Sequence, residues 1–333
     1  QSEEFRKYPG QRSLGDVITR LPGVTMDGPP NQNKDVRLRG LDKNFTRFEF
    51  DGVQIPVGDD KRGFSVNRLS SLLVGEVTVL RAPTAEYEAD GIAGKILTES
   101  REIPDTFQME FKTGYGGVSE SGGSSSFSDF DGDYKTAEMY VGGPLNEQWG
   151  VNAVVSYTEF PLQLSKDVSK NKTKFLTDAK NDPQEFEEET KLEDEFKPQE
   201  RINLFANLEY KYATGKLNFK PFLANFKEPN NKTGLKTVEK FDAALNGSKV
   251  GPTETEEAAT TETEDEEFNA TGITFENEQR VDGYDMRVES LFSYFETSEE
   301  KANDKKEVKT KRNGDGSFNK KEVKFEDEVE DKE

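Results

Sequence analysis

The sequence contains neither cysteine nor histidine in its 333 residues. Without cysteine the chain has no disulfide, no thiolate metal site and no cysteine nucleophile. Without histidine it has no imidazole general base, no Ser–His pair for nucleophilic catalysis and no histidine ligand for zinc or haem. The sequence also shows no phosphate-binding glycine loop and no pair of acids in a defined setting. We therefore expect a protein that is not an enzyme and that uses neither a cofactor nor a bound metal.

Long apolar runs are missing as well. No stretch approaches the 18 or so consecutive apolar residues of a transmembrane helix. The chain begins QSEEFRKYPG, without a basic and apolar leader, so an exported protein would already have been processed. Only 32% of the residues are apolar and the mean hydropathy is −0.88. Such values suit a chain with much disorder, but they also suit a membrane β-barrel, in which only every second residue faces lipid.

An excess of basic residues is absent too. The chain has 45 lysines and arginines against 66 aspartates and glutamates, and its net charge is −21. Binding to nucleic acid needs a basic face, so we expect no nucleic-acid partner. Residues 1–105 are nearly balanced in charge, and the excess acid therefore lies after them, where solubility is its simplest explanation.

The first hundred residues carry the signals of a small α+β domain. The pair Asp51-Gly52 lies between alternating apolar residues of segment 45–56 and predicts a β-hairpin. A second helical patch is expected over residues 65–73. Strands are expected at 36–41, 76–80 and 95–98. The first helix is predicted by a capping signal, Ser13 with Asp16, and by an apolar stripe at Leu14, Val17, Ile18 and Leu21.

The order of these elements resembles the plug domain of TonB-dependent outer-membrane receptors. The family motifs SLxDVLxxLPGV, RIRG, IDGVP, VEVLRGP and YGxxxxGGxIN are matched by Ser13–Val24, Arg37–Gly40, Phe50–Pro56, Val77–Pro83 and Tyr87–Ile96. Five motifs in the right order and at the right spacings make a specific match. The chain departs from the pattern at Ala82, where the family has glycine, and at residues 93–95, where Ala-Gly-Lys replaces Gly-Gly-Val.

The resemblance implies a plug domain over residues 1–105 and the N-terminal part of a β-barrel over residues 106–333. In the family, plug arginines of two of these motifs form ion pairs with glutamates on the barrel wall. The resemblance gives this role to Arg39 and Arg81, and less directly to Arg37. The alternative is that these arginines are solvated or pair within the plug.

The resemblance also implies a ligand site at the plug apex. The loop 58–63 follows the predicted hairpin, and plug apices in this family help to line the extracellular ligand pocket. Candidate ligand-binding residues are therefore Asp59, Asp60, Lys61 and Arg62. Ordinary turn chemistry explains these charges equally well.

Residues after 106 contain stripes in which apolar and polar residues alternate, as in strands that face lipid on one side. The stripes lie at 107–115, 137–141, 149–157, 202–212 and 284–294, with weaker ones at 217–226 and 267–277. Trp149 and Tyr157 are placed like the two aromatic girdles of a barrel.

The gaps between the stripes are alternately long and short, as extracellular loops and periplasmic turns are. We expect long loops at 118–133, at 160–200 and from about residue 228, and a polar ribbon over 297–330 that turns near 313–316. About seven strands are expected, which cannot enclose a plug, because plugged transporters use about 22. The predicted fold is an α+β plug inside an antiparallel barrel of 22 strands, of which only the first part is encoded here.

Two acidic motifs favour ordinary structure over a metal site. Segment 129–133, DFDGD, has carboxylates at alternate positions, but its glycine stands at the fourth position of a calcium-binding loop, where the sixth is required, and Tyr140 replaces the closing glutamate. A loop turn is the better interpretation. Residues 254–267 hold eight acids and no base, which predicts a solvated, mobile loop, with cation binding as the alternative.

The function that the resemblance implies is energised uptake across the bacterial outer membrane. A scarce ligand such as a siderophore, an oligosaccharide or cobalamin would bind from outside, and the TonB complex of the inner membrane would then displace the plug. Outer-membrane lipid would surround the barrel. No TonB box is recognisable in residues 1–12. Two alternatives remain: a surface docking platform that has a surface lipoprotein as partner, and a surface-adhesive β-protein, which would leave the ordered motifs unexplained.

Overall fold

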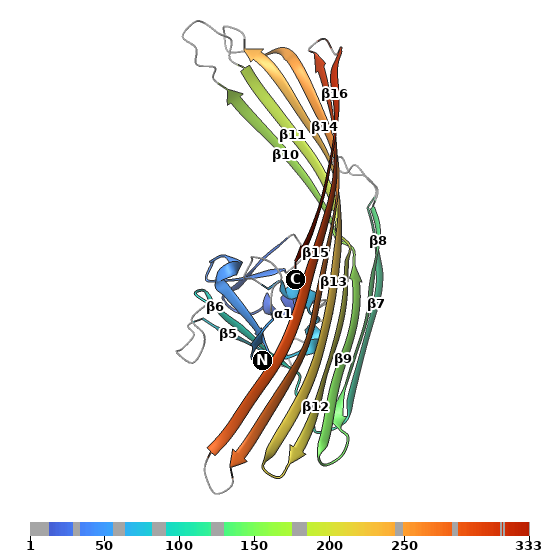
Figure 1. The fold of residues 1–333 in the computed structure, drawn as a ribbon. Helices are drawn as coiled ribbons and strands as arrows, with labels where there is room; N and C mark the ends of the chain where they lie inside the picture. The colour runs from blue at the N-terminus through green and yellow to red at the C-terminus, as the bar shows by residue number, and fades with distance from the viewer. Residues whose placement is uncertain are drawn as a thin grey trace.

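The computed structural model shows a small N-terminal domain lying against the concave side of a long, curved β-sheet (Figure 1). We refer to the part from the first helix to strand β6 as the N-terminal domain and to the ten-stranded sheet that follows as the sheet. The structure describes residues 13–28, 34–55, 64–81, 91–120, 130–174, 185–243, 249–281, 286–313, 315 and 317–332.

The N-terminal domain is an α+β unit built from short elements. The predicted first helix is present, and the backbone N–H of Ser13 donates to Asp16 Oδ2 at 3.2 Å, as the capping signal predicts. One two-stranded sheet pairs β1 with β2, and a four-stranded sheet has the order β4-β3-β6-β5. The elements are α1 (Leu14–Ile18), β1 (Val24–Asp27), β2 (Asp35–Leu38), η2 (Lys43–Phe45), β3 (Thr46–Phe50), β4 (Val53–Gln54), η3 (Val66–Arg68), η4 (Ser71–Leu73), β5 (Val74–Leu80) and β6 (Gly94–Ser100).

The predicted hairpin at Asp51-Gly52 is confirmed. Strands β3 and β4 are antiparallel, with Phe50 opposite Val53. Both turn residues have positive φ, 48° for Asp51 and 75° for Gly52, as a two-residue hairpin turn of type I′ requires. The helical patch predicted over 65–73 is instead two 3₁₀ turns, separated by extended backbone at Leu69. The physical reason is that side chains of the sheet bind the carbonyls of this segment, which a continuous helix would need for its own hydrogen bonds.

The sheet consists of long antiparallel strands. Eight of them follow the order β16-β15-β14-β13-β12-β9-β8-β7. Strand β11 pairs with residues 231–242 of β13, and β10 pairs with β11. Their bounds are β7 (Gln108–Glu120), β8 (Phe130–Pro144), β9 (Trp149–Phe160), β10 (Gln163–Lys174), β11 (Glu185–Phe196), β12 (Gln199–Tyr212), β13 (Gly215–Ala243), β14 (Lys249–Val281), β15 (Met286–Asn313) and β16 (Phe318–Lys332).

The prediction of about seven strands was too low, and the predicted loop at 160–200 is wrong. That segment holds β10 and β11, which continue β9 and β12 after short breaks at Pro161-Leu162 and at Lys197-Pro198. Proline has no N–H to donate to a ladder, so it interrupts a strand without preventing its resumption.

The acidic segment 254–267 is also not a loop, because it forms part of β14. Lysines on the neighbouring strands offset its charge; Lys232 and Lys311, for example, pair with glutamates of this segment. The loop turn predicted for 129–133 is wrong for the residues that the structure describes there, since β8 begins at residue 130. The polar ribbon is confirmed: β15 and β16 pair, and the N–H of Asn313 donates to the carbonyl of Ser317 at 3.0 Å.

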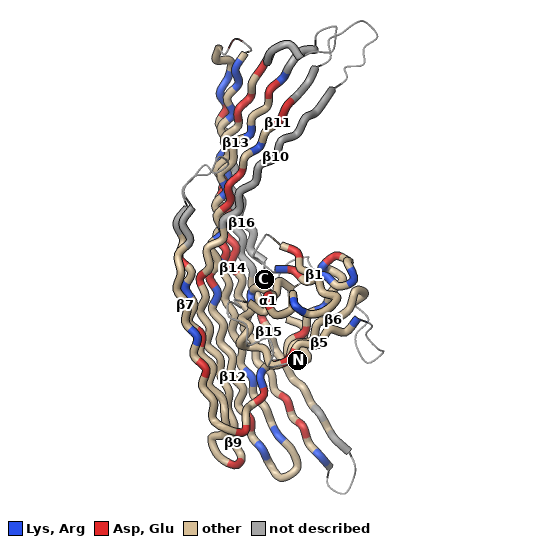
Figure 2. Tube along the Cα trace, turned by 180° about the vertical axis from the view of Figure 1, so that it is seen from behind, with Lys and Arg blue, Asp and Glu red and all other residues tan. Residues whose placement is uncertain are grey.

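The two faces of the sheet alternate as the stripes predict. On β12, Leu204 and Leu208 are exposed on the convex face, while Asn203 and Asn207 are buried on the concave face. Exposed apolar side chains gather in the part of the sheet near the short turns at 145–148 and 213–214, which we call the lower half. At the other end of the long strands charged residues dominate, after residue 227 on β13, before residue 268 on β14 and after residue 296 on β15. We call this part, together with β10, β11 and β16, the extension (Figure 2). None of the helices in the described ranges is long and apolar enough to cross a membrane.

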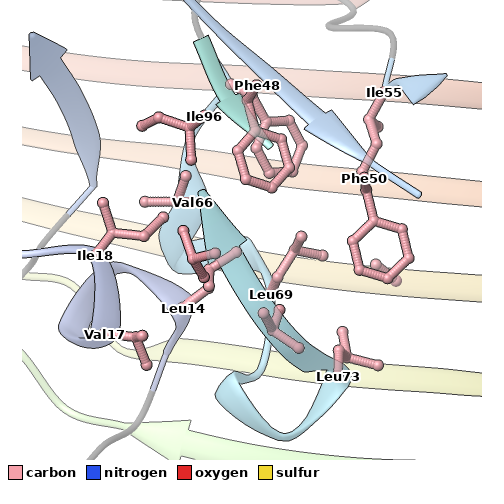
Figure 3. Close-up of a cluster of buried hydrophobic side chains, with 14 of the residues drawn as sticks. Leu14, Val17, Ile18, Phe48, Phe50, Ile55, Val66, Leu69, Leu73 and Ile96 are labelled. Carbon is pink, nitrogen blue, oxygen red and sulfur yellow. The ribbon is translucent and has the colours of Figure 1, made fainter. Parts of the chain in front are cut away.

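The hydrophobic core of the N-terminal domain lies between α1, the 3₁₀ turns and the four-stranded sheet (Figure 3). Leu14, Ile18, Leu69, Leu73 and Ile96 have no measurable exposure. Burying each such side chain contributes roughly 1.5–3 kcal/mol to stability. The same cluster continues into aromatic residues of the sheet, so the two parts share one core.

Candidate functional site

Polar side chains of the sheet hold the backbone of the N-terminal domain at residues 67–70. Arg201 Nη1 donates to the carbonyls of Asn67 at 2.7 Å and Leu69 at 3.2 Å. Asn203 donates through Nδ2 to the carbonyl of Arg68 at 3.3 Å and accepts from the N–H of Ser70 at 2.7 Å. The two sheet residues are 4% and 0% exposed, so these bonds form away from water. This docking segment is therefore fixed by contacts to its main chain.

Arg68 provides the strongest side-chain contact between the two parts. Its guanidinium lies 4.1 Å from the centre of the Phe268 ring and donates to Glu266 at 2.6 Å. Lys34 approaches the same glutamate at 3.8 Å and Glu228 at 3.9 Å. A buried guanidinium needs a carboxylate partner, and here the sheet supplies it.

Glu138 forms a second buried node on the sheet. It is 1% exposed and accepts hydrogen bonds from Ser70 Oγ at 2.8 Å and from Ser156 Oγ at 3.0 Å. Lys112 balances its charge, with 3.1 Å between the charged groups. The node thus joins three strands of the sheet, β7, β8 and β9, to the docking segment.

The hairpin turn makes a third contact, at the lower end of the interface. Asp51 accepts from the N–H of Ser100 at 2.7 Å, which fixes the end of β6 to the turn. Its second oxygen lies 3.4 Å from Lys220 Nζ on β13, and Lys220 also donates to Glu276 at 2.7 Å. One aspartate therefore closes a turn, holds a strand end and binds the sheet.

Beside this turn lies a polar cleft of about 470 Å³ between the N-terminal domain and strands β12–β14. One wall is formed by the N-terminal domain and the residues just after it and carries both acids and a base; the sheet wall carries lysines, two glutamates and buried amides. The charged and amide lining residues are Asp51, Glu99, Arg101, Glu102, Asn207, Glu209, Lys211, Lys216, Asn218, Lys220 and Glu276. Burial raises the pKa of Glu99, and the nearby charges of Glu76 and Asp51 raise it further. Because charged and amide groups line both walls, this part of the contact suits bridging water better than close packing.

The arginines expected to pair with a barrel wall lie elsewhere. Arg37 on β2 forms an ion pair with Asp27 inside the N-terminal domain. Arg39 follows β2, is exposed and has a φ of 57°. Arg81 follows β5 and donates to the carbonyl of Pro22 within the N-terminal domain. Their pairing with wall glutamates stays a prediction.

Two glycines of the motifs, Gly23 and Gly94, lie beside Arg81, and both have a positive φ that disfavours other residues. The Arg81 guanidinium donates to the carbonyl of Pro22, and a Cβ on Gly23 would lie 2.7 Å from its Nη2. Gly94 has a φ of 134°, and a Cβ there would lie 2.4 Å from the carbonyl of Leu80. Three motifs therefore meet at one place on the domain.

The departures from the family pattern have a partial structural account. Lys95 is 2% exposed and pairs with Glu49 on the neighbouring strand at 2.9 Å, so the domain provides a partner for the added charge. Ala82 and the candidate ligand residues Asp59, Asp60, Lys61 and Arg62 lie outside the described residues.

Above the docked domain, the concave face of the extension carries lysines and glutamates in alternation. Lys232 lies within 3.0 Å of Glu264, 3.1 Å of Glu262 and 3.8 Å of Glu195. Burial alone would lower the pKa of Lys232, but its hydrogen bonds to Glu264 and Glu262 outweigh this and raise it. The same pairing lowers the pKa of Glu264 against the effect of burial. In the described part of the chain no group of acids is arranged to hold a metal ion.

Reasoning from the sequence missed the residues that carry the observed interface, Arg68, Arg201 and Glu138. Arg68 did leave a signal, because it stands among apolar residues in the segment expected to be a buried helix. Arg201 and Glu138 were recognisable only as polar residues on the inner face of a stripe, which gives no indication of a partner.

Comparison with known proteins agrees with the sequence motifs. Residues 1–95 match the family model of the TonB-dependent receptor plug domain. The chain is 26% identical over 161 residues to the ferric enterobactin receptor PirA of Pseudomonas aeruginosa, and this alignment covers 44% of the chain and 21% of that protein.

Solved structures with some similarity include the siderophore receptor PirA from Acinetobacter baumannii, with 13% identity and a TM-score of 0.40, covering 92% of this chain and 60% of that one. Another is the unliganded ferric citrate transporter FecA, with 13% identity and a TM-score of 0.41, covering 99% and 58%. The chain thus spans 21% of the curated relative and 58–60% of these two solved chains.

Proposed function

Residues 1–95 are the plug domain of a TonB-dependent receptor, and from this premise we propose that the protein takes up a ferric siderophore across the outer membrane. Receptors of this family are outer-membrane proteins. The curated relative is a ferric enterobactin receptor, which favours an iron-carrying ligand over an oligosaccharide or cobalamin.

The observation that carries the proposal is the position of the plug. It lies on the concave side of a curved antiparallel sheet, and the lower half of that sheet exposes apolar side chains on its convex side (Figure 1). This arrangement supports a lumen that contains a plug and a wall that faces lipid. We propose that the wall closes as a barrel of about 22 strands, the size that plugged outer-membrane transporters use, with the plug within residues 1–105 and barrel from residue 106.

In the proposed cycle the ligand binds from the side of the extension. The plug loop with Asp59, Asp60, Lys61 and Arg62 and the charged concave face of the extension would line its site. The TonB complex would then pull on the plug from the opposite side. We propose that Arg37, Arg39 and Arg81 contact the part of the wall that faces the other side of the plug, since the wall seen here is already bound by Arg68 and Asp51.

Iron uptake in a deletion strain tests the proposal. Under iron limitation, loss of the gene should abolish uptake of one class of radiolabelled ferric siderophore, and the intact gene should restore it only in cells with a functional TonB complex. Uptake that does not change for any ferric siderophore, or that does not depend on the TonB complex, would contradict the proposal. A defect confined to an oligosaccharide or to cobalamin would reject the iron assignment while keeping the transport mechanism.

A further inference from the structure

The concave face of the sheet has a feature that a water-filled lumen does not require. Inward-facing residues of such a lumen are typically polar. Here four phenylalanines on β12, β13 and β14 face inward at the level of the plug, and each is at most 5% exposed. They are Phe205, Phe222, Phe226 and Phe268.

Three of these rings meet aromatic rings of the plug, and the fourth, Phe226, lies 5.9 Å from the guanidinium of Arg68. Phe50, which precedes the hairpin turn, lies 6.0 Å from Phe205 and 5.7 Å from Phe222 between ring centres. Phe64, which precedes the docking segment, lies 6.3 Å from Phe268. We refer to these six residues of plug and sheet as the phenylalanine cluster. It replaces water between the two surfaces with ring-to-ring contact.

The cluster separates two polar regions. On the extension side, the next inward residues of β13 are Glu228 and Asn230. On the other side lies the polar cleft of about 470 Å³, where Asn207 and Asn218 are 6% and 7% exposed and their Oδ1 atoms have no partner among the described residues. Such buried amide oxygens are satisfied by water where water can enter. The interface is therefore polar, then apolar, then polar along the strands.

We propose that the phenylalanine cluster is a permeability seal, which closes the resting receptor to ions and small solutes along this sector of the wall. An apolar constriction excludes water and so imposes a desolvation cost on any ion that enters it. Attachment of the plug does not need this cluster, because Arg201, Asn203 and Arg68 already hold the docking segment. The proposal depends on the proposed function only in that the wall must close around the plug.

Conductance of the whole protein in planar lipid bilayers tests the seal. Phe222→Asn places an amide in the cluster and should raise the ionic conductance of the resting receptor by about tenfold, which corresponds to about 1.4 kcal/mol. Phe222→Leu keeps the site apolar and should remain as closed as the wild type. The matched control is Phe275→Asn, the same substitution on the convex face of the neighbouring strand, where Phe275 is 48% exposed, and it should not change conductance.

A loosened plug is the competing explanation for a leak, and Arg201→Ala separates the two. This substitution removes two hydrogen bonds to the docking segment without changing the cluster. Limited proteolysis measures how firmly the plug is attached. By this measure the Arg201→Ala variant should have a looser plug than the Phe222→Asn variant, and yet it should have a lower ionic conductance. The proposal would be overturned if conductance increased with plug loosening across the variants. It would also be overturned if the wild type conducted as well as the Phe222→Asn variant. Neither result depends on siderophore uptake, so failure of the seal and failure of the transport proposal remain distinguishable.

Discussion

The lower half and the extension belong to the same strands, yet they are stabilised in different ways. In the lower half, apolar residues such as Leu208 and Phe275 are exposed on the convex face and the plug covers the concave face. In the extension, cross-strand ion pairs such as Lys311–Glu256, 2.9 Å apart, contribute the stability that the plug contributes in the lower half. The backbone ladder is the same in both, so in the proposed barrel the side chains alone would set where lipid ends and water begins. The predictions below test this division, starting with the largest expected effect.

Arg68→Ala should destabilise the docked state of the lower half by about 3–5 kcal/mol, because it leaves Glu266 buried without its main cation. Urea denaturation monitored at the plug would measure this loss. Lys135→Ala is the control: its ion pair with Glu159 is exposed, makes no contact with the described part of the plug and is worth at most about 1 kcal/mol. Equal effects of the two variants would show that the observed interface does not hold the plug.

Phe275→Arg should cost about 2–4 kcal/mol of folding stability in lipid, because it places a charge on the convex face of the lower half. Thr263→Arg lies on the same strand and the same face, but within the extension and opposite Asp304. This second change should stay within about 0.5 kcal/mol. Refolding into lipid vesicles would compare them, and a large cost at both positions would place the lipid boundary higher than we infer.

Acid should loosen the extension before the lower half. Hydrogen bonding to Lys311 lowers the pKa of Glu256, and Glu264 is lowered by its bonds to Lys232. A carboxylate with a lowered pKa contributes stability above its unfolded value of 4.5, and this contribution is lost as the pH falls through the folded pKa. Each exposed pair is worth about 0.2–1 kcal/mol. Hydrogen exchange should therefore quicken in β14 and β15 of the extension below about pH 4.5, while the docking segment keeps its protection; uniform loosening would contradict the division.

The smallest effect is expected at Glu99, beside the polar cleft. Its pKa is raised, so the folded state binds a proton more tightly than the unfolded chain and loses stability as the pH rises above 4.5. Glu99→Gln removes this penalty and should stabilise the plug at neutral pH by a few tenths of a kcal/mol. Thermal melts at pH 4 and pH 7 should show the gain only at the higher pH, and a loss at pH 7 would contradict the account of the cleft.

Local signals in the sequence predicted much of the fold. The turn at Asp51-Gly52 was recognisable because few residues accept positive φ, and such turns are decided within four residues. The convex stripe of β12 was recognisable because a period of two is imposed by the strand itself. These features depend on neighbours in the sequence.

The remaining features depend on contacts distant in the sequence. The segment 254–267 looked like a mobile loop because its eight acids have no bases within it, but the compensating lysines lie on other strands. Arg68 and Glu266 are 198 residues apart, and no local pattern connects them. The inward phenylalanines were missed because alternation predicts which face a residue takes and does not predict what the face touches.

The way in which the sheet holds the docking segment has an evolutionary consequence. Arg201 and Asn203 bind main-chain groups of residues 67–70, which every amino acid other than proline presents alike. Mutations in the side chains of this segment would leave those bonds intact, so the plug can diverge in sequence here without losing its register as long as the wall keeps Arg201 and Asn203. A chimaera that carries the plug of another receptor in this wall should therefore still seat at this point, and the identity of residue 68 should decide how firmly it does so.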